Sequence, residues 1–347
     1  MTDAVTSSDA DALAAALALV LDSALPDTGP GRVQGLRRLS GGASQETWAF
    51  DRISAAGQRP LILRRAPTGG AQRSSGGPGL AAEAVLIRLA DAAGVPVPDV
   101  VAELAPQHRL GDGFIMQRLP GETLGRRIAA AARPALAWQC GQALARIHAL
   151  PDDRLPALRL TQPQAEVDYL RAWHGRHGTV RPVFQLALRW LADHAPADVS
   201  PRLVHGDFRN GNLMVDLDDA ANPLRGVLDW ELAHRGDPMA DLGWLCINAW
   251  RFGQTDRVVG GFGDLDPLFA GYRDAGGQVD ADRVFWWQVL GTLRWGVICE
   301  SMGHAWASGA EPVMEKAAIG RRASETEIDL LLLIAPRPAH APEARPA

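Results

Sequence analysis

A dense group of polar and ionisable residues lies between two short apolar segments in the second half of the chain. It reads His205-Gly206-Asp207-Phe208-Arg209-Asn210-Gly211-Asn212, and another carboxylate, Asp229, ends a later apolar segment. Local turns explain one or two of these residues, because Asp and Asn bond their own backbone and glycine permits positive φ. They do not explain the second carboxylate. Asp207, Asn212 and Asp229 at one place would form an oxygen-rich site suited to Mg²⁺ and substrate phosphates.

The spacing of these residues narrows the chemistry. An Asp followed five positions later by Asn, then by a strand and a second Asp, is the order found in protein-kinase phosphoryl transfer. Here the motifs are HGDFRNGN, LDWE and a later GDPMADL that contains Asp241. Together they resemble the aminoglycoside phosphotransferase and choline-kinase-like family of small-molecule kinases, from about Leu39 to Leu333. The resemblance implies an α+β, two-lobed protein-kinase-like fold. Its N-terminal lobe would be a small antiparallel sheet with a helix, and its larger C-terminal lobe mainly α-helical.

The resemblance also implies roles for the polar residues. Asp207 matches the catalytic base for the acceptor hydroxyl, and Asn212 and Asp229 match the ligands of Mg²⁺. His205 is placed with Asp207 in the catalytic loop, although a histidine there more often orients the backbone. Asp241 precedes an apolar helix and is expected to cap its N-terminus.

The first lobe supplies the residues expected to bind the nucleotide, ATP or GTP. Gly41, Gly42 and Ser44 match the hairpin that covers the phosphates, although a double glycine between strands is by itself common. Arg64 stands where kinases have a phosphate-binding lysine, and arginine is a planar, bidentate cation instead of a point charge. Glu83 matches its acidic partner; a solvated helix face is the alternative.

The segment that joins the two lobes matches the part of the family that contacts adenine through its backbone. It contains Gln117 and Leu119, which we assign to nucleotide binding. His148, in the helical sequence LARIHAL, is expected to be a hydrogen-bonded core histidine.

The elements that position these residues follow from the hydrophobic pattern. A helix is expected over about 9–25, β-strands over 33–65, and a loop over 67–79 before a helix that ends at Gly94. Beyond the segment 116–122 the pattern becomes helical. The predicted organisation is 1–118 for the nucleotide-binding lobe, 119–335 for the catalytic and acceptor-binding lobe, and 336–347 for a flexible tail.

Composition excludes several other classes of protein. The chain has 347 residues, with 35 Lys plus Arg against 40 Asp plus Glu and a net charge of −5, which argues against nucleic-acid and membrane-surface binding. Lys316 is the only lysine and no Walker motif occurs, so lysine-based and P-loop chemistry are excluded. Three dispersed cysteines favour neither disulfides nor zinc.

The N-terminus does not resemble a signal peptide and no apolar run approaches membrane length, so a cytoplasmic protein is expected. The oligomeric state is not predicted.

The acceptor is expected to be a small hydroxylated molecule. A polycationic aminoglycoside would require acidic side chains, yet residues 243–310 contain few acids beside several arginines and tryptophans. An apolar or anionic hydroxylated acceptor fits better, with a true aminoglycoside kinase as an alternative. The strings Trp250-Arg251-Phe252-Gly253 and Gly320-Arg321-Arg322 resemble the kinase domain of some acyl-CoA dehydrogenase proteins, which implies hydroxy-acid or hydroxyacyl acceptors.

Two other classes of function remain as alternatives. A nucleotide-binding pseudokinase would act as a regulatory module, but it would not need the complete set of Asp207, Asn212 and Asp229. A metal-dependent hydrolase built on His205 and Asp207 lacks the additional ligands of a transition-metal site.

Overall fold

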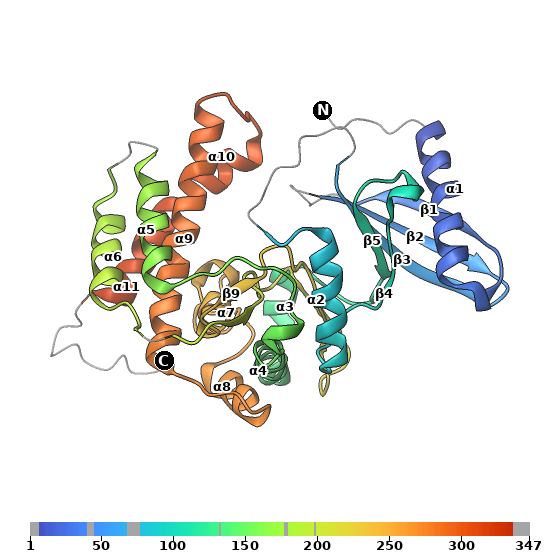
Figure 1. The fold of residues 1–347 in the computed structure, drawn as a ribbon. Coiled ribbons are helices and arrows are strands. Elements are labelled where there is room, and N and C mark those ends of the chain that lie inside the picture. The colour runs from blue at the N-terminus through green and yellow to red at the C-terminus, as the bar shows by residue number, and fades with distance from the viewer. Residues whose placement is uncertain are drawn as a thin grey trace.

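The N-terminal part of the protein is an antiparallel sheet covered by a helix. The structure, a computed structural model, describes residues 7–39, 45–67, 77–131, 133–176, 180–197 and 199–335. Its five-stranded sheet has the order β1-β2-β3-β5-β4. The strands are β1 (Gly31–Arg38), β2 (Glu46–Ser54), β3 (Gly57–Arg65), β4 (Val100–Glu103) and β5 (Gly113–Gln117). Helix α1 (Ser7–Ala24) lies against the sheet at one end of the molecule (Figure 1).

The core of this sheet follows the alternation of its strands. Trp48 and Phe50 of β2 and Leu61 and Leu63 of β3 are buried, together with Leu17 of α1. Arg52 of β2 links the C-terminal end of α1 to the sheet by hydrogen bonds. The Arg52 guanidinium donates to Asp22 Oδ1 at 2.9 Å and to Thr28 Oγ1 at 2.7 Å. The hydrogen bond from Arg52 lowers the pKa of Asp22.

Helix α2 (Leu80–Ala92) lies between the sheet and the remaining helices (Figure 1). Its buried Leu86 and Ile87 belong to the same hydrophobic cluster as Leu144 and Ile147 of helix α4 (Pro134–His148). The helix ends at Ala92 and is followed by Ala93 and then Gly94, whose φ of +76° suits the glycine that the sequence predicted as its cap. Helix α2 is therefore packed against the helical lobe as well as the sheet, which places Glu83 at the boundary.

The second half of the chain is mainly helical. Its helices are α3 (Gly125–Ala131), α4 (Pro134–His148), α5 (Pro163–Gly175), α6 (Pro182–Asp193), α7 (Met239–Leu245), α8 (Leu265–Asp274), α9 (Ala281–Ala307), α10 (Met314–Gly320) and α11 (Ala323–Ile334). Two short antiparallel pairs interrupt them: β6 (Arg202–Val204) with β9 (His234–Gly236), and β7 (Leu213–Val215) with β8 (Leu224–Val227). The polar motifs lie in the segments next to these strands, between β6 and β7 and directly after β8.

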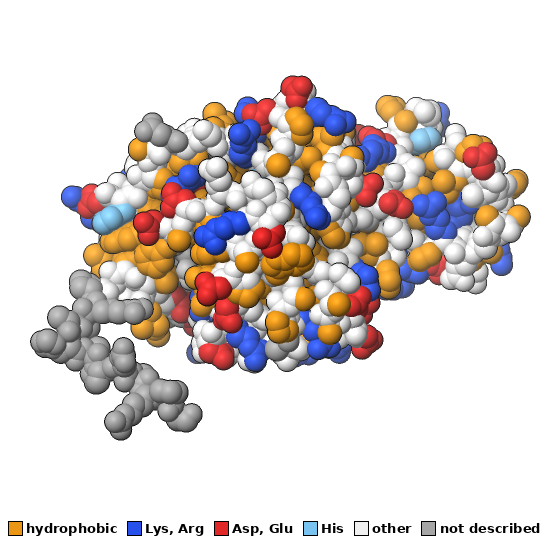
Figure 2. Space-filling model, turned by 90° about the horizontal axis from the view of Figure 1, so that it is seen from below, with side chains coloured by type: hydrophobic (Ala, Val, Ile, Leu, Met, Phe, Trp, Pro, Cys, Tyr) orange, Lys and Arg blue, Asp and Glu red, His pale blue; other side chains and the backbone are white. Residues whose placement is uncertain are grey.

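The fold class is the one expected, an α+β molecule with a sheet-containing part and a helical part. The expected first helix begins at Ser7 and ends at Ala24, within two residues of the prediction. The expected tail and most of the expected loop over 67–79 lie outside the described residues. On the face shown in Figure 2, acidic and basic side chains are interspersed among hydrophobic ones. Among the described residues, no helix is long and apolar enough to cross a membrane.

Candidate active site

The segment between β6 and β7, which we call the catalytic loop (residues 205–212), is shaped by a glycine. Gly206 has φ of +83°, and a Cβ at this position would lie 2.4 Å from the carbonyl oxygen of Leu232. Only glycine fits here without moving the neighbouring backbone. Asp207 follows this turn directly, and its carboxylate contacts Trp244 of α7.

The Asp207 carboxylate is held by three side chains. Its Oδ1 accepts hydrogen bonds from Arg209 Nε at 2.9 Å and from Trp244 Nε1 at 2.8 Å. Its Oδ2 accepts from Asn212 Nδ2 at 2.6 Å. Because both carboxylate oxygens accept hydrogen bonds from side chains, the orientation of the carboxylate is fixed without a ligand.

His205 is completely buried, and both of its ring nitrogens have partners inside the fold. Nε2 lies 3.1 Å from the Leu228 carbonyl oxygen and donates to it, while Nδ1 accepts from the Asp207 backbone N–H at 3.3 Å. Burial lowers the pKa of His205, which keeps the ring neutral as this pattern requires. The contacts support a positioning role for His205, joining the catalytic loop to the segment before Asp229.

Asp241 anchors the catalytic loop instead of capping α7. Its oxygens accept the backbone N–H groups of His205 and Gly206 at 2.8 and 2.9 Å. It also lies 3.1 Å from His148 Nε2, and His148 Nδ1 lies 2.8 Å from the Tyr272 hydroxyl. The expectation of an N-cap was wrong, because α7 begins at Met239 and Asp241 already lies in its first turn. The expectation of a hydrogen-bonded core histidine at position 148 is confirmed.

Across the cleft, Arg64 of β3 is surrounded by carboxylates. Its Nε lies 3.1 Å from Glu83 Oε2, and its Nη2 lies 2.7 Å from Asp229 Oδ1 and 3.1 Å from Glu231 Oε2. The Arg64 side chain is only 13% exposed and that of Glu83 only 2%. The structure thus brings Arg64, Glu83 and Asp229 together.

In this group one cation, Arg64, faces three carboxylates. Burial opposes the charge on Arg64, but the three carboxylates outweigh it and raise its pKa. Burial raises the pKa of Glu83 to about 7 despite its ion pair with Arg64. The two directions are consistent because one cation is shared by three carboxylates, and Glu83 is the most deeply buried of them.

Asp229 adopts an unusual backbone conformation. Its φ is +65°, a region that residues other than glycine occupy at a cost of about 1–3 kcal/mol. Leu228 N–H donates to the Asn212 carbonyl at 2.8 Å, so the two segments are joined directly beside this residue. The arrangement turns the Asp229 side chain into the cleft.

Asn212 and Asp229 suit a hard divalent cation. Both hydrogen bonds of the Asn212 side chain use its amide nitrogen, which leaves the amide oxygen as a ligand atom. An amide oxygen and a carboxylate, completed by phosphates and water, form a donor set that Mg²⁺ accepts. Among the described residues, no three His, Cys, Asp or Glu side chains form a group that could hold a metal ion.

A cleft of about 390 Å³ connects these groups. It is lined by residues of both halves of the chain, including Arg64, Gln117, Leu119, Asn212 and Asp229. The Gln117 N–H already donates to the Asp99 carbonyl at 2.9 Å. A nucleotide base bound in this cleft would therefore need other backbone groups of the segment that joins the two lobes. Gly41, Gly42 and Ser44 lie outside the described residues.

Three side chains in contact with the site were missed from the sequence. Trp244 was grouped with core tryptophans, Arg209 was not singled out, and Glu231 was given no role. The position of Arg209 two residues after Asp207 is a local signal that could have indicated it. Trp244 donates from α7, 37 residues further along the chain, and only the packing of that helix reveals it.

Comparison with known proteins agrees with this geometry. The antiparallel sheet and the helical lobe, with a cleft lined by Asn212 and Asp229, form a kinase-like fold. Residues 35–275 match the Phosphotransferase enzyme family, and the chain belongs to this family. The family resemblance inferred from the motifs is thereby confirmed.

A curated relative is acyl-CoA dehydrogenase family member 10 of Mus musculus, 29% identical over 221 residues. The match covers 60% of this chain but only 20% of the relative, so this chain spans about a fifth of that protein. The expected resemblance to the kinase domain of such proteins is confirmed as a sequence relationship.

Solved structures show the same fold. A putative aminoglycoside phosphotransferase from Ralstonia eutropha has a TM-score of 0.67 and 19% identity, covering 91% of this chain and 97% of its own. Wild-type aminoglycoside 2'-phosphotransferase-IIIa, solved as a GDP complex, has a TM-score of 0.64 and 17% identity, covering 90% and 97%.

Proposed function

We propose that the protein transfers the γ-phosphoryl group of a Mg²⁺-bound nucleotide, ATP or GTP, to a hydroxyl group of a small molecule. The observation that carries this proposal is the fixed Asp207 carboxylate, which shares Asn212 with the cleft that holds Arg64 and Asp229. A relative of the same fold was solved with GDP, which supports a nucleotide in this cleft.

Asp207 is the base in this proposal. A carboxylate has about four acceptor sites, and three side-chain donors use three of them, so one direction remains for the acceptor hydroxyl. The hydroxyl proton passes to this carboxylate as the acceptor oxygen bonds to the γ-phosphorus, while the bond from that phosphorus to the β–γ bridging oxygen breaks and releases the nucleoside diphosphate. Positioning of the attacking oxygen is the main contribution expected of the protein in this reaction class.

The negative charge of the nucleotide phosphates would be neutralised by Arg64 and by Mg²⁺ bound to Asn212 and Asp229. Mg²⁺, held by the amide oxygen of Asn212 and the carboxylate of Asp229, would neutralise charge on the transferred phosphate. Arg64 turns part of its guanidinium from Asp229 towards the phosphates, while Glu83 keeps the other edge in place. His205 and Asp241 hold the loop that carries Asp207.

The acceptor is a hydroxylated molecule of apolar or anionic character. Relatives that carry acyl-CoA dehydrogenase in their name support hydroxy acids or hydroxyacyl compounds as the class to test.

A nucleotide-consumption screen tests the proposal. Purified protein with Mg²⁺ and ATP or GTP is offered short hydroxy acids, choline analogues and amino sugars. We expect consumption that depends on both Mg²⁺ and an acceptor, and a loss of about a hundredfold or more in Asp207→Asn, because the positioned base is removed. Asp207→Asn should still bind nucleotide. Turnover near that of the unmodified protein in this variant would refute the assignment.

A further inference from the structure

The helical lobe contains a second large cavity, which we call the basic cavity. Its volume of about 620 Å³ exceeds the 390 Å³ of the cleft that holds Arg64 and Asp229. Small-molecule sites have volumes of about 300–1,000 Å³, so it has room for a ligand. Among the described residues, the cavity and the cleft have no lining residue in common. The polar side chains that line the cavity are His148, Ser200, Arg202, Tyr272, Gln278 and Arg283.

The charged side chains of the basic cavity are positive. Its described lining contains Arg202 and Arg283 but no Asp or Glu. Arg202 is exposed and is the first residue of β6, the strand that leads into the catalytic loop. Within the part of the chain that the structure describes, no carboxylate forms an ion pair with Arg202. Because a guanidinium forms its strongest hydrogen bonds with phosphate or carboxylate oxygens, the ligand that complements this cavity is an oxyanion.

Arg283 of α9 is held in position by a buried carboxylate. Its Nε lies 3.1 Å from Asp237 Oδ2, and its Nη2 pairs with Asp237 Oδ1. Trp287 Nε1 donates to the same Oδ2 at 2.7 Å. The Nη1 atom of Arg283 has no hydrogen-bond partner among the described residues, and 28% of the side chain is exposed. The fold therefore fixes one edge of the guanidinium and leaves the other edge available to a ligand.

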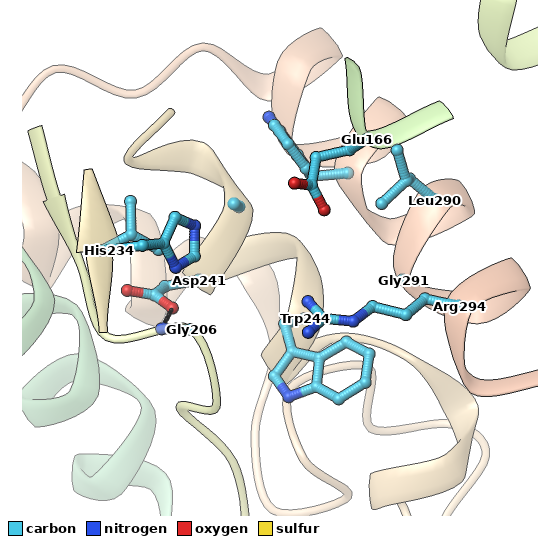
Figure 3. A pocket seen from close by; sticks show the side chains of 11 residues that line it. Glu166, Gly206, His234, Asp241, Trp244, Leu290, Gly291 and Arg294 are labelled. Atoms are coloured by element: carbon cyan, nitrogen blue, oxygen red, sulfur yellow. Dashed lines mark hydrogen bonds between the residues drawn. The ribbon is translucent and has the colours of Figure 1, made fainter. Parts of the chain in front are cut away.

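Hydrogen bonds connect the wall of the basic cavity to the catalytic loop. The lowered pKa of Asp241 keeps its carboxylate charged, so His148 donates to it from Nε2 and accepts from the Tyr272 hydroxyl at Nδ1. Figure 3 shows the next step, in which the Asp241 carboxylate points to the Gly206 backbone. The cavity drawn there measures about 30 Å³ and has room for little more than a water molecule. The basic cavity is large enough to give a ligand access to these bonds from the side of Tyr272 and His148.

A pair of glycines lies against Tyr272 at the edge of the basic cavity. The Gly277 N–H donates to the Tyr272 carbonyl at 2.9 Å, and a Cβ on Gly277 would lie 2.2 Å from the Tyr272 ring. Only glycine lets the backbone lie so close to this ring. Gly276 has φ of +88° and open space where a Cβ would be. Because glycine restricts the backbone least, segment 276–278 is the part of the cavity wall that a ligand can reposition at least cost.

We propose that the basic cavity binds a small molecule through a phosphate or carboxylate group in contact with Arg202 and Arg283, and that its occupation raises turnover. A ligand that also contacts Gln278 holds segment 276–278 against Tyr272, which keeps the Tyr272 hydroxyl on His148. By linkage, a ligand that binds this arrangement more tightly increases the fraction of molecules that adopt it. The binding site goes beyond the proposed kinase function, and its effect on turnover rests on that function.

The test uses anions without an alcohol group, so that none of them can serve as a phosphate acceptor. The anionic probes are phenylphosphonate and benzene-1,3-dicarboxylate, which separate the two classes of anion, and the neutral probe is benzamide. Calorimetric titrations contain Mg²⁺ and a saturating non-hydrolysable ATP analogue, which keeps the nucleotide cleft occupied. Turnover is measured at saturating ATP, with and without each probe, using an acceptor from the nucleotide-consumption screen.

For the unmodified protein we expect at least one anion to bind with a Kd of about 1 mM or tighter, and benzamide to bind about tenfold or more weakly than that anion. Arg202→Gln should weaken anion binding by about tenfold or more. Its turnover without a probe should stay unchanged, because Arg202 is exposed. The matched control is Arg273→Gln on α8, an exposed arginine outside the described lining, which should leave anion binding unchanged.

Two further variants test the site and its connection to the catalytic loop. Arg283→Gln is avoided, because it would leave the buried Asp237 without its cation. Ser200→Glu instead places a carboxylate at an exposed position of the lining and should weaken anion binding by repulsion. Tyr272→Phe should keep anion binding but lose most of the rise in turnover, which we expect to be about twofold or more in the unmodified protein.

The inference is overturned if the anions bind no more tightly than benzamide, or if their binding survives both Arg202→Gln and Ser200→Glu. It is also overturned if a bound anion leaves turnover unchanged, or if the rise persists in Tyr272→Phe. Failure of the kinase function is distinguishable, because it would appear as no Mg²⁺-dependent nucleotide consumption with any acceptor, or as consumption unchanged in Asp207→Asn. Anion binding that depends on Arg202 would still support the basic cavity as a binding site in that case.

Discussion

Arg64 is the residue at which this chain departs most from the kinase pattern. A lysine would offer one compact charge, whereas the guanidinium contacts Glu83 with one nitrogen and Asp229 and Glu231 with another. This geometry allows the cation to keep its place beside α2 while it exchanges one carboxylate for phosphate.

Arg64→Ala should weaken nucleotide binding and turnover together. It also leaves the buried Glu83 without a counter-charge, so the free energy of unfolding should fall by on the order of 3 kcal/mol. Nucleotide titration and chemical denaturation measure the two effects. Arg64→Lys should restore part of both, because a point charge restores attraction but not the fork.

A double variant tests the coupling between Arg64 and Glu83. Glu83→Gln should give a milder defect than Arg64→Ala, and the two combined should lose less than the sum of the single losses. Additive losses would mean that the pair is not coupled, and unchanged nucleotide affinity in Arg64→Ala would remove Arg64 from the binding site.

At the scale of elements, the catalytic loop is held by a chain of hydrogen bonds that begins on α8. It runs from the Tyr272 hydroxyl to His148 on α4, then to Asp241 on α7, and ends at the backbone of His205 and Gly206. The buried Asp241 carboxylate depends on these donors: burial opposes its charge, but the hydrogen bond from His148 helps to lower its pKa.

Removal of His148 should therefore loosen the loop. In His148→Leu, one oxygen of Asp241 loses a donor inside the core, which costs about 1–3 kcal/mol of stability. We also expect a lower kcat with nearly unchanged nucleotide affinity. Tyr272→Phe is the matched control, since it keeps the bond from His148 to Asp241 and should cost less. Equal losses of stability and kcat in the two variants would contradict this order of hydrogen bonds.

The motifs and the packing differ in how far sequence could predict them. Strands, the α2 helix with its Gly94 end, and the placement of Asp207, Asn212 and Asp229 follow from local spacing and turn chemistry, which sequence displays directly. The roles of Trp244, Glu231 and Asp241 depend on how α7 and the segment after β8 pack against the loop. Such contacts join residues far apart in the chain, and local patterns do not encode them.

At the scale of the whole molecule, stability should depend on pH through Glu83. Its pKa rises from an ordinary 4.5 to about 7 in the folded protein. Between these values the folded protein holds a proton that the unfolded chain has lost, so this carboxyl makes the free energy of unfolding decrease as pH rises. The slope from one group is at most about 1.4 kcal/mol per pH unit.

Chemical denaturation of nucleotide-free protein from pH 5 to 8 measures this effect. His205 acts in the opposite direction, because its lowered pKa makes stability fall as pH drops below its ordinary 6.5. The difference between the unmodified protein and Glu83→Gln isolates the carboxyl. As pH rises, we expect the free energy of unfolding of the unmodified protein to fall relative to that of Glu83→Gln, by at most about 1.4 kcal/mol per pH unit. A relative free energy of unfolding that does not change with pH would show that Glu83 stays charged.

The absence of lysine near the described cleft has a practical consequence for detection. Reagents that identify kinases by acylating a primary amine beside the nucleotide phosphates need a lysine there, and a guanidinium, which stays protonated, does not react in this way. Lys316 is the only lysine of the chain and lies on α10, where it pairs with Glu311. A proteome-wide survey with amine-directed nucleotide probes would therefore pass over this protein even if the cleft binds nucleotide as proposed.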